Sequence, residues 1–275
     1  MKKRIAVLLG IPLAFVALAQ SHELTKKWES PATLKVPESV YLDQKRQVLY
    51  VSNIDGEPWG DDKKGSIGKV SLDGKVIAAE WVTGLSAPKG LALVGNLLYV
   101  GDMKEVVVID VEKGAIAKRI EMPGAQGLND VAANPKGNVY VSDSYGKKLY
   151  VLKNDKPEVV VDNLKGPNGV LCHNGLVYLL DGDSAYIVGA DRSLKAISTG
   201  MEGVLDGIEP VSKDEFLVST WQGTLFYVKA DGTHELLLDT REDKINAADI
   251  GYDAKKRIVY VPTFFKNSVV AYELK

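Results

Sequence analysis

One short pattern decides the fold of this chain: LYVSN at residues 49–53, an apolar strand that ends in two small polar residues. Similar segments follow it five times. They are LYVGD at 98–102, VYVSD at 139–143, VYLLD at 177–181, FLVST at 216–220 and VYVPT at 259–263. The starts are 49, 41, 38, 39 and 43 residues apart, and a period near 40 in strand-rich sequence is typical of a β-propeller.

Further strands are expected between these copies. Runs such as KEVVVIDV (104–111) and KKLYVLK (147–153) are apolar or alternating, and turn dipeptides such as Asp73-Gly74 follow such runs. This spacing gives about four strands per unit. We therefore predict an all-β, six-bladed β-propeller. Two separate β-sandwiches are the less favoured alternative, because no linker-like segment divides the repeats.

The two ends of the repeat array should meet. Only three strands are expected in the last unit, and an incomplete blade would leave an exposed sheet edge. The missing strand is predicted at residues 24–29, where Trp28 precedes the first unit much as Trp81 precedes the second. The N-terminal strand is therefore expected to join the last blade and close the ring.

The first 19 residues resemble a signal peptide. Three basic residues at 2–4 precede an apolar run at 5–18, and small residues stand before the expected cleavage site after Ala19. The run is shorter than the roughly 20 residues that span a bilayer, and Pro12 interrupts it. We expect one propeller domain over 20–275 in the periplasm or secreted, with no stable membrane anchor after cleavage. An uncleaved anchor is the lesser alternative.

Composition excludes several function classes. The chain has 34 Lys and Arg against 36 Asp and Glu, so no basic field for nucleic acid is expected. Cys172 is the single cysteine, which rules out a disulfide or a thiolate cluster within one chain. The three histidines lack zinc-site spacing, and no glycine-rich phosphate loop precedes a helix. The expected partner is a small-molecule substrate.

Polar residues recur at one position of the repeat, two residues before a recurring apolar residue of each unit. These positions are Glu38, Lys89, Asn129, Asn168, Asp206 and Ala248. The innermost strands of a propeller stand side by side, so equivalent positions should form a ring at one mouth of the central channel. Buried carboxylates and amides are costly unless they are paired or bind an ion, so packing alone does not explain this pattern.

Three residues of the ring offer only hard oxygen acceptors: Glu38, Asn168 and Asp206. This set suits one divalent cation, which could be calcium, magnesium, manganese or zinc. The dipeptides at 168–169 and 206–207 could also be ordinary turns when each is taken singly. Their recurrence in one column favours a metal site.

Other polar residues surround the predicted ring. Asp130 and Asp249 come one residue after ring positions, so they should face the other side of their strands. Four residues end second strands near the same mouth and could either support the site or bind strand-end amides, the second being favoured. They are Asn53, Asp102, Asp143 and Asp181.

Loops are expected to shape access to the mouth. The longest, at 54–65, contains Trp59 and is predicted to be a solvated lid. A second calcium site there is less favoured, because the loop lacks the glycine and terminal glutamate of an EF-hand. Trp221 and Phe264 lie in corresponding loops and could either wall the pocket or pack on the surface.

These motifs resemble the senescence marker protein, gluconolactonase and luciferin-regenerating enzyme family, which are regucalcin-like six-bladed propellers. The resemblance covers residues 24–275. It is carried by Pro37-Glu38, Leu128-Asn129-Asp130, Pro167-Asn168-Gly169 and Leu205-Asp206-Gly207. It implies that Glu38, Asn168 and Asp206 bind the metal, that Asn129 contacts substrate, and that the family's lactone or ester hydrolysis takes place here.

Two residues depart from the family pattern. Gly127 stands where lactonases of the family often carry an arginine, and Lys89 adds a cation to the ring. Lys89 could bind a substrate carboxylate or phosphate, or it could pair with Asp249 or Glu38. The substrate is therefore expected to differ from gluconolactone and could be anionic.

The sequence thus favours a metal-dependent hydrolase of a lactone or related ester. Asp206 is the candidate catalytic residue, as a ligand that also takes a proton from the attacking water. Asn129 and Lys89 are the candidate substrate-binding residues. The alternative is a noncatalytic periplasmic propeller that binds a small ligand or a partner protein.

Overall fold

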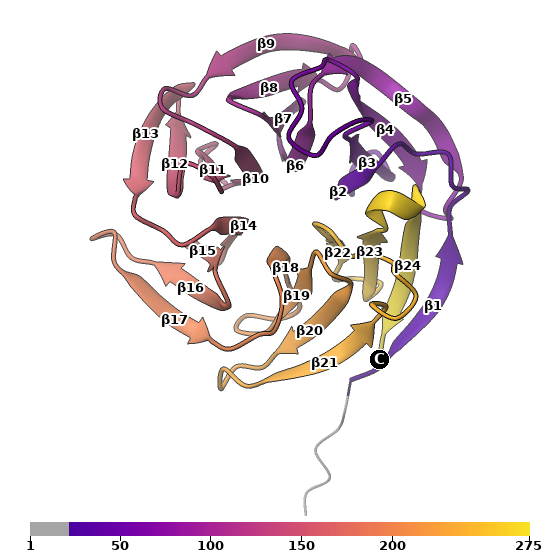
Figure 1. The fold of residues 1–275 in the computed structure, drawn as a ribbon, viewed down its shortest axis with the longest axis vertical. Coiled ribbons are helices and arrows are strands. Elements are labelled where there is room, and N and C mark those ends of the chain that lie inside the picture. Colours follow the sequence, from indigo (N-terminus) through magenta and orange to yellow (C-terminus); the bar gives the residue numbers. More distant parts are fainter. Residues whose placement is uncertain (1–21) are drawn as a thin grey trace, which may run out of the picture.

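The structure, a computed structural model, describes residues 22–275, so the predicted signal peptide at 1–19 lies outside the described residues. Six antiparallel sheets of four strands stand radially around a central axis (Figure 1). The six-bladed propeller predicted from the repeat is confirmed. No helix in the described range is long and apolar enough to cross a membrane.

The first three blades follow one another along the chain, and each runs from its innermost to its outermost strand. Blade 1 consists of β2 (Pro37–Asp43), β3 (Val48–Asn53), β4 (Gly65–Ser71) and β5 (Val76–Leu85). Blade 2 consists of β6 (Pro88–Val94), β7 (Leu97–Asp102), β8 (Glu105–Asp110) and β9 (Ala115–Glu121). Blade 3 consists of β10 (Leu128–Ala133), β11 (Val139–Asp143), β12 (Lys148–Lys153) and β13 (Lys156–Val161).

The last three blades repeat this order, and only the sixth takes a strand from elsewhere in the chain. Blade 4 consists of β14 (Pro167–His173), β15 (Leu176–Asp181), β16 (Ser184–Val188) and β17 (Leu194–Ser198). Blade 5 consists of β18 (Leu205–Pro210), β19 (Phe216–Thr220), β20 (Thr224–Val228) and β21 (His234–Asp239). Blade 6 consists of β22 (Gly251–Asp253), β23 (Ile258–Pro262), β24 (Val269–Leu274) and β1 (Leu24–Glu29). A single 3-10 turn in this range, η1 (Phe264–Lys266), joins β23 to β24.

The N-terminal strand closes the ring, as predicted. β1 pairs antiparallel with β24, from Leu24 opposite Leu274 to Glu29 opposite Val270. Trp28 of this strand donates a hydrogen bond to the Leu72 carbonyl oxygen of blade 1. The first strand therefore ties the sixth blade to the first, and the sheet edge of blade 6 is covered.

The burial of each strand follows its place in the blade. All six residues of β3 are buried because neighbouring blades cover both faces of a middle strand. The outermost β9 alternates between exposed residues and half-buried or buried ones because one face meets solvent. This is why the middle strands read as continuous apolar runs and the outer strands as alternating ones. The core lies between facing blades.

The dipeptides at 168–169 and 206–207 belong to strands, so their interpretation as turns is wrong. A β-carbon on Gly169 would lie 2.4 Å from the carbonyl oxygen of Asp206 in the next blade. A β-carbon on Gly207 would lie 3.0 Å from the Cα of Asp249. Glycine is needed here because adjacent innermost strands approach each other closely around the channel.

Candidate functional site

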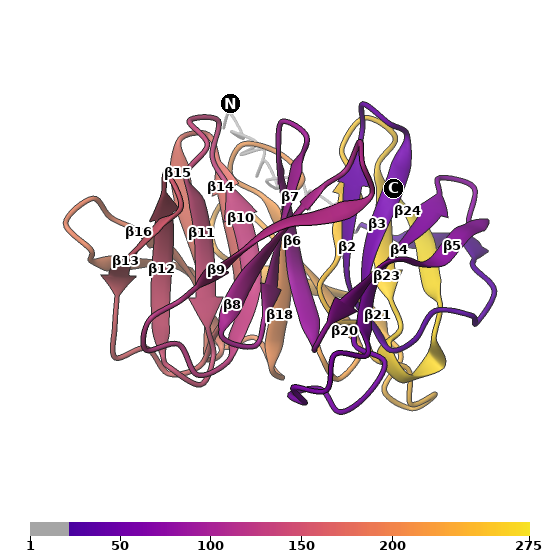
Figure 2. The ribbon, with the colours of Figure 1, turned by 90° about the horizontal axis from the view of Figure 1, so that it is seen from above.

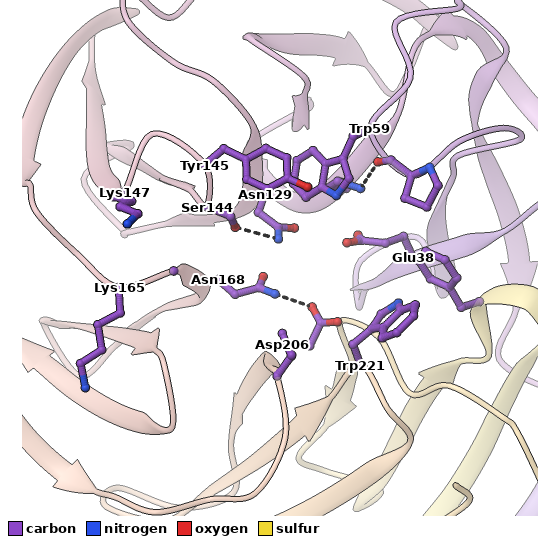
Figure 3. A pocket seen from close by; sticks show the side chains of 15 residues that line it. Glu38, Trp59, Asn129, Ser144, Tyr145, Lys147, Lys165, Asn168, Asp206 and Trp221 are labelled. Atoms are coloured by element: carbon purple, nitrogen blue, oxygen red, sulfur yellow. Dashed lines mark hydrogen bonds between the residues drawn. The ribbon is translucent and has the colours of Figure 1, made fainter.

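Five polar side chains meet at the end of the channel where the innermost strands begin, which we call the site mouth. Each is the second residue of its innermost strand, so a common register brings them to one level. They are Glu38 of β2, Lys89 of β6, Asn129 of β10, Asn168 of β14 and Asp206 of β18. All five are buried and line one cavity of about 590 Å³ (Figure 3). The sixth position, Ala248, lies just before β22 and adds no polar group.

The three predicted metal ligands form an oxygen-rich floor in this cavity. The Asn168 amide nitrogen donates a hydrogen bond to Asp206 Oδ1 at 3.1 Å. Asn168 Oδ1 and Glu38 Oε2 are buried and accept no hydrogen bond within residues 22–275. Figure 3 shows the Glu38 and Asp206 carboxylates and the Asn168 amide directed toward a shared space.

Buried acceptors without partners cost free energy unless a ligand satisfies them. Two such oxygens beside a second carboxylate fit a divalent cation that prefers hard oxygen ligands. No cluster of three or more His, Cys, Asp or Glu suited to a metal occurs in the described residues. The candidate donor set is therefore two carboxylates and one amide, which would leave positions for water or substrate.

The two carboxylates of the floor are held in an environment that disfavours their charge. Burial raises the pKa of Glu38 to about 7, although the nearby charge of Lys89 opposes the shift. Burial also raises the pKa of Asp206 well above its ordinary value, and the charge of Glu38 adds to this. A cation bound between them would favour both ionised forms.

Lys89 is held by the loop that follows β3. Its ammonium donates a hydrogen bond to the Pro58 carbonyl oxygen at 2.8 Å and lies 4.3 Å from the centre of the Trp59 ring. Its ammonium forms no salt bridge in the described part of the chain, so of the two roles left open, the pairing with Asp249 or Glu38 is not observed. Burial lowers the pKa of Lys89, while the charge of Glu38 opposes this shift. The substrate-binding role of Lys89 stays a prediction.

Asn129 is held by a serine that was not singled out in the sequence. Its amide nitrogen donates to Ser144 Oγ at 3.1 Å, and Ser144 Oγ donates to the Pro167 carbonyl oxygen at 2.6 Å. Ser144 and Tyr145 directly follow the repeated strand VYVSD. Their position at the site-mouth end of a second strand is the sequence feature from which they could have been predicted.

The loop at 54–64 covers one side of the site mouth, as expected for a lid (Figure 2). Trp59 packs against Tyr145 of blade 3, with ring centroids 4.5 Å apart. A β-carbon on Gly127 would lie 2.7 Å from the Tyr145 ring and 2.9 Å from the Trp59 ring. Gly127 therefore makes room for an aromatic wall.

Trp221 and Phe264 line the same cavity from blades 5 and 6. Their rings meet edge to face, with centroids 5.7 Å apart. Of the two roles expected for them, the structure agrees with the pocket wall.

The acids that end the second strands bind backbone amides, which was the favoured expectation. Asp102 accepts hydrogen bonds from the Ser86 and Ala87 amides, just before Lys89. In the next two blades, Asp143 binds the amides of 126–127, and Asp181 binds those of 165–166. Asn53 receives a longer contact of 3.4 Å from the Lys35 amide. These acids position the ring residues by fixing the segments that lead into the innermost strands.

Asp130 and Asp249 line a different and smaller cavity, of about 220 Å³, toward the end of the channel where the innermost strands finish. We call this end the opposite mouth. The Asp130 carboxylate accepts hydrogen bonds from the Val131 and Val170 amides, both at 2.6 Å. Asp249 accepts one from Ser39 Oγ at 2.5 Å. Neither lines the cavity at the site mouth, although the charge of Asp249 helps to raise the pKa of Asp206.

Several solved structures are similar to this propeller. Among solved structures, a "putative gluconolactonase" is 14% identical and superposes with a TM-score of 0.69 over 92% of each chain. A streptogramin B lyase is 11% identical, with a TM-score of 0.66 over 93% of this chain and 98% of the other. A protein of unknown function from Bacteroides thetaiotaomicron is 14% identical, with a TM-score of 0.68 over 93% of this chain and 76% of the other.

This chain shares its fold with these proteins. No protein-family model and no curated protein matches it significantly. Identities of 11–14% establish the fold and leave the chemistry to the side chains at the site mouth. The six-bladed architecture is the one that the resemblance to gluconolactonases implies.

Proposed function

We propose that this propeller is a hydrolase of a lactone or related ester that uses one divalent cation at the site mouth. One observation carries the proposal: Glu38, Asn168 and Asp206 converge on the floor of the cavity, with two buried oxygens that lack partners. The presence of a gluconolactonase-like structure and a lyase among the structural neighbours supports enzymatic use of this fold. We place the protein in the periplasm or outside the cell.

The residues of the site suggest a division of labour. Glu38, Asn168 and Asp206 would hold the cation, which when bound would polarise the carbonyl oxygen and stabilise negative charge that develops on it. The Asp206 carboxylate would take the proton of the attacking water, because a carboxylate that holds the cation would also lie beside a water bound there. Asn129 and Lys89 would orient the substrate beside it.

The proposal is tested by stripping the protein of metal and reloading it with calcium, magnesium, manganese or zinc in turn. Proton release is then measured on a panel of lactones and aryl esters. We expect turnover with at least one metal, loss of turnover on chelation, and loss in the Asp206→Ala variant. Metal binding without turnover of any lactone or ester would contradict it.

A noncatalytic propeller that binds a small ligand or a partner protein is the second candidate. Gly127 in place of arginine and the Lys89 cation in the ring favour it, because both depart from the lactonase pattern. The same experiment separates the two, since this candidate predicts binding without any metal-dependent proton release.

A further inference from the structure

Two aromatic walls stand above the polar floor of the cavity. One is formed by Trp59 and Tyr145, from loops of blades 1 and 3. The other is formed by Trp221 and Phe264, from blades 5 and 6. Figure 3 shows Trp59 with Tyr145 on one side of the cavity and Trp221 on another, with the floor between them.

The rim above these walls exposes apolar side chains to water. Tyr145 is 55% exposed, Val204 is 56% exposed and Trp221 is 36% exposed, and all three line the cavity. Phe265, 55% exposed, extends the rim from Trp221, with ring centroids 6.3 Å apart. Clustered exposed apolar groups around a pocket mark a binding surface for an apolar partner group.

The walls offer few hydrogen-bonding groups above the floor. A sugar ring would need partners for several hydroxyl groups, because each one desolvated without a partner weakens binding. The wall residues Trp59, Tyr145, Trp221 and Phe264 and the rim residue Val204 present mainly carbon surface to the cavity. The cavity therefore suits a flat apolar ring better than a sugar.

Charge in the cavity has the opposite sign to that of the whole chain. Three lysines line it, Lys89, Lys147 and Lys165, against two carboxylates, Glu38 and Asp206, so the formal balance is 3 − 2 = +1. The whole chain carries −2. Neither Lys147 nor Lys165 has a carboxylate within 4 Å in the described part of the chain. Figure 3 shows the Lys165 side chain directed away from the floor. Both lysines are exposed, so their flexible side chains are free to turn toward an anionic group of a ligand at this edge.

We propose that the substrate of this site is a lactone or ester that carries a planar aromatic ring and an anionic group such as a carboxylate. The aromatic ring lies between the two walls, and the anionic group lies at the edge formed by Lys147 and Lys165. The carbonyl then reaches the floor beside Asp206. This inference rests on the proposed function for the reaction, while the binding preference stands on the cavity alone.

The binding preference is tested on metal-free protein by calorimetry with naphthalene-2-carboxylate and its neutral counterpart, 2-naphthalenemethanol. We expect the carboxylate to bind at least about tenfold more tightly, since only it gains the cationic edge. The Lys147→Gln/Lys165→Gln double variant should reduce the preference to within about threefold. The control is Lys45→Gln/Lys136→Gln, two exposed lysines in turns at the opposite mouth, which should leave it unchanged.

The aromatic walls are tested with the same probe. Trp221→Ala and Tyr145→Ala should each weaken binding of naphthalene-2-carboxylate by about fivefold or more, because each removes a stacking surface. Leu236→Ala, at an exposed position of outer strand β21, is the matched control and should bind normally. Because these side chains are exposed, the variants should keep the melting temperature of the parent protein.

Three results would overturn the inference: equal binding of the charged and neutral probes, a preference that survives the double lysine variant, or gluconate binding as tightly as the naphthalene probe. The outcome is separable from the hydrolase proposal. If the probes bind as expected and no lactone is turned over, the hydrolase proposal is contradicted and the binding preference is supported. If neutral aliphatic lactones are turned over in preference to anionic aryl lactones, the hydrolase proposal is supported and the proposed substrate class is contradicted.

Discussion

The two mouths of the channel use the same kind of residue for different purposes. In the cavity that opens to the opposite mouth, Asp130 is buried and Asp249 is half-buried, and their carboxylates accept hydrogen bonds from the Val131 and Val170 amides and from Ser39 Oγ. At the site mouth, Glu38 and Asn168 are buried, and each keeps an oxygen without a partner. Burial of an acid is therefore not by itself a sign of function. Unsatisfied acceptors at the floor of a cavity distinguish Glu38 and Asn168 from Asp130 and Asp249.

The largest expected effect is on catalysis at the site mouth. Asp206→Ala should lower kcat/KM for the best lactone by about a thousandfold or more, since it removes both a metal ligand and the proposed base. Asp249→Asn, which changes a carboxylate facing the other way, should stay within about threefold of the parent. Steady-state kinetics on the reloaded proteins measure both. Equal losses in the two variants would erase the distinction between the mouths.

Metal affinity should follow the unsatisfied oxygens. Glu38→Gln keeps the size of the side chain and removes its charge, so it should weaken binding of the activating metal by about a hundredfold. Isothermal titration with that metal measures this. The comparison is Asp130→Asn, which should change affinity by less than about threefold. Retained affinity in Glu38→Gln would remove Glu38 from the ligand set.

For stability, the order of the two sets of variants should be reversed, with the larger loss at Asp130. Asp130→Ala leaves the buried amides of Val131 and Val170 without their acceptor, which should lower the free energy of unfolding by about 2 kcal/mol or more. Asp206→Ala removes a buried carboxylate whose charge is disfavoured and leaves one buried donor, the Asn168 amide, without its acceptor, so in metal-free protein it should cost less. Urea denaturation of both variants decides this. A larger loss for Asp206→Ala would show that the site mouth is the one built for stability.

The pH dependence of stability should trace to the acids with raised pKa. Burial raises the pKa of Asp249 to about 7, despite the Ser39 hydrogen bond that opposes the shift. Its neutral form is favoured in the folded state, so metal-free protein should lose stability as the pH rises from about 4 to about 7. Asp249→Asn should flatten this part of the profile and raise stability near pH 8. An unchanged profile would assign the dependence to other groups.

The smallest effect is expected at the lid. Gly127→Ala adds a methyl group that would meet the Trp59 and Tyr145 rings, so the wall should shift. We expect KM for an aryl lactone to rise by about threefold to tenfold with little change in kcat, because the floor is untouched. A fall in kcat alone would mean that the lid acts on the floor.

Part of the site could be predicted because it repeats. Glu38, Asn168 and Asp206 lie far apart in the chain, yet each holds the second position of an innermost strand. Strand alternation and a common register are local properties, so aligned units predict which side chains share a mouth. The repeat also predicted that Asp130 and Asp249 would face elsewhere.

The surroundings of the floor could not be predicted in the same way. Ser144, Lys147 and Lys165 lie in segments between strands, where no periodicity indicates a direction. The Trp59 ring packs over Gly127, which brings together loops of two blades. The sequence of one loop does not indicate that the other will contact it. The sequence could not decide whether Lys89 binds substrate or forms an ion pair. The Pro58 carbonyl oxygen that accepts a hydrogen bond from its ammonium comes from another blade.

The sequence by itself determined the number of blades, the closing strand and the register of the polar ring, since these follow from hydrophobic periodicity and from the need to cover a sheet edge. Only the tertiary structure decided which oxygens keep no partner, how the lid and the aromatic walls enclose the cavity, and where its cations stand. Those features depend on contacts between loops of different blades, and such contacts form only when the ring has closed.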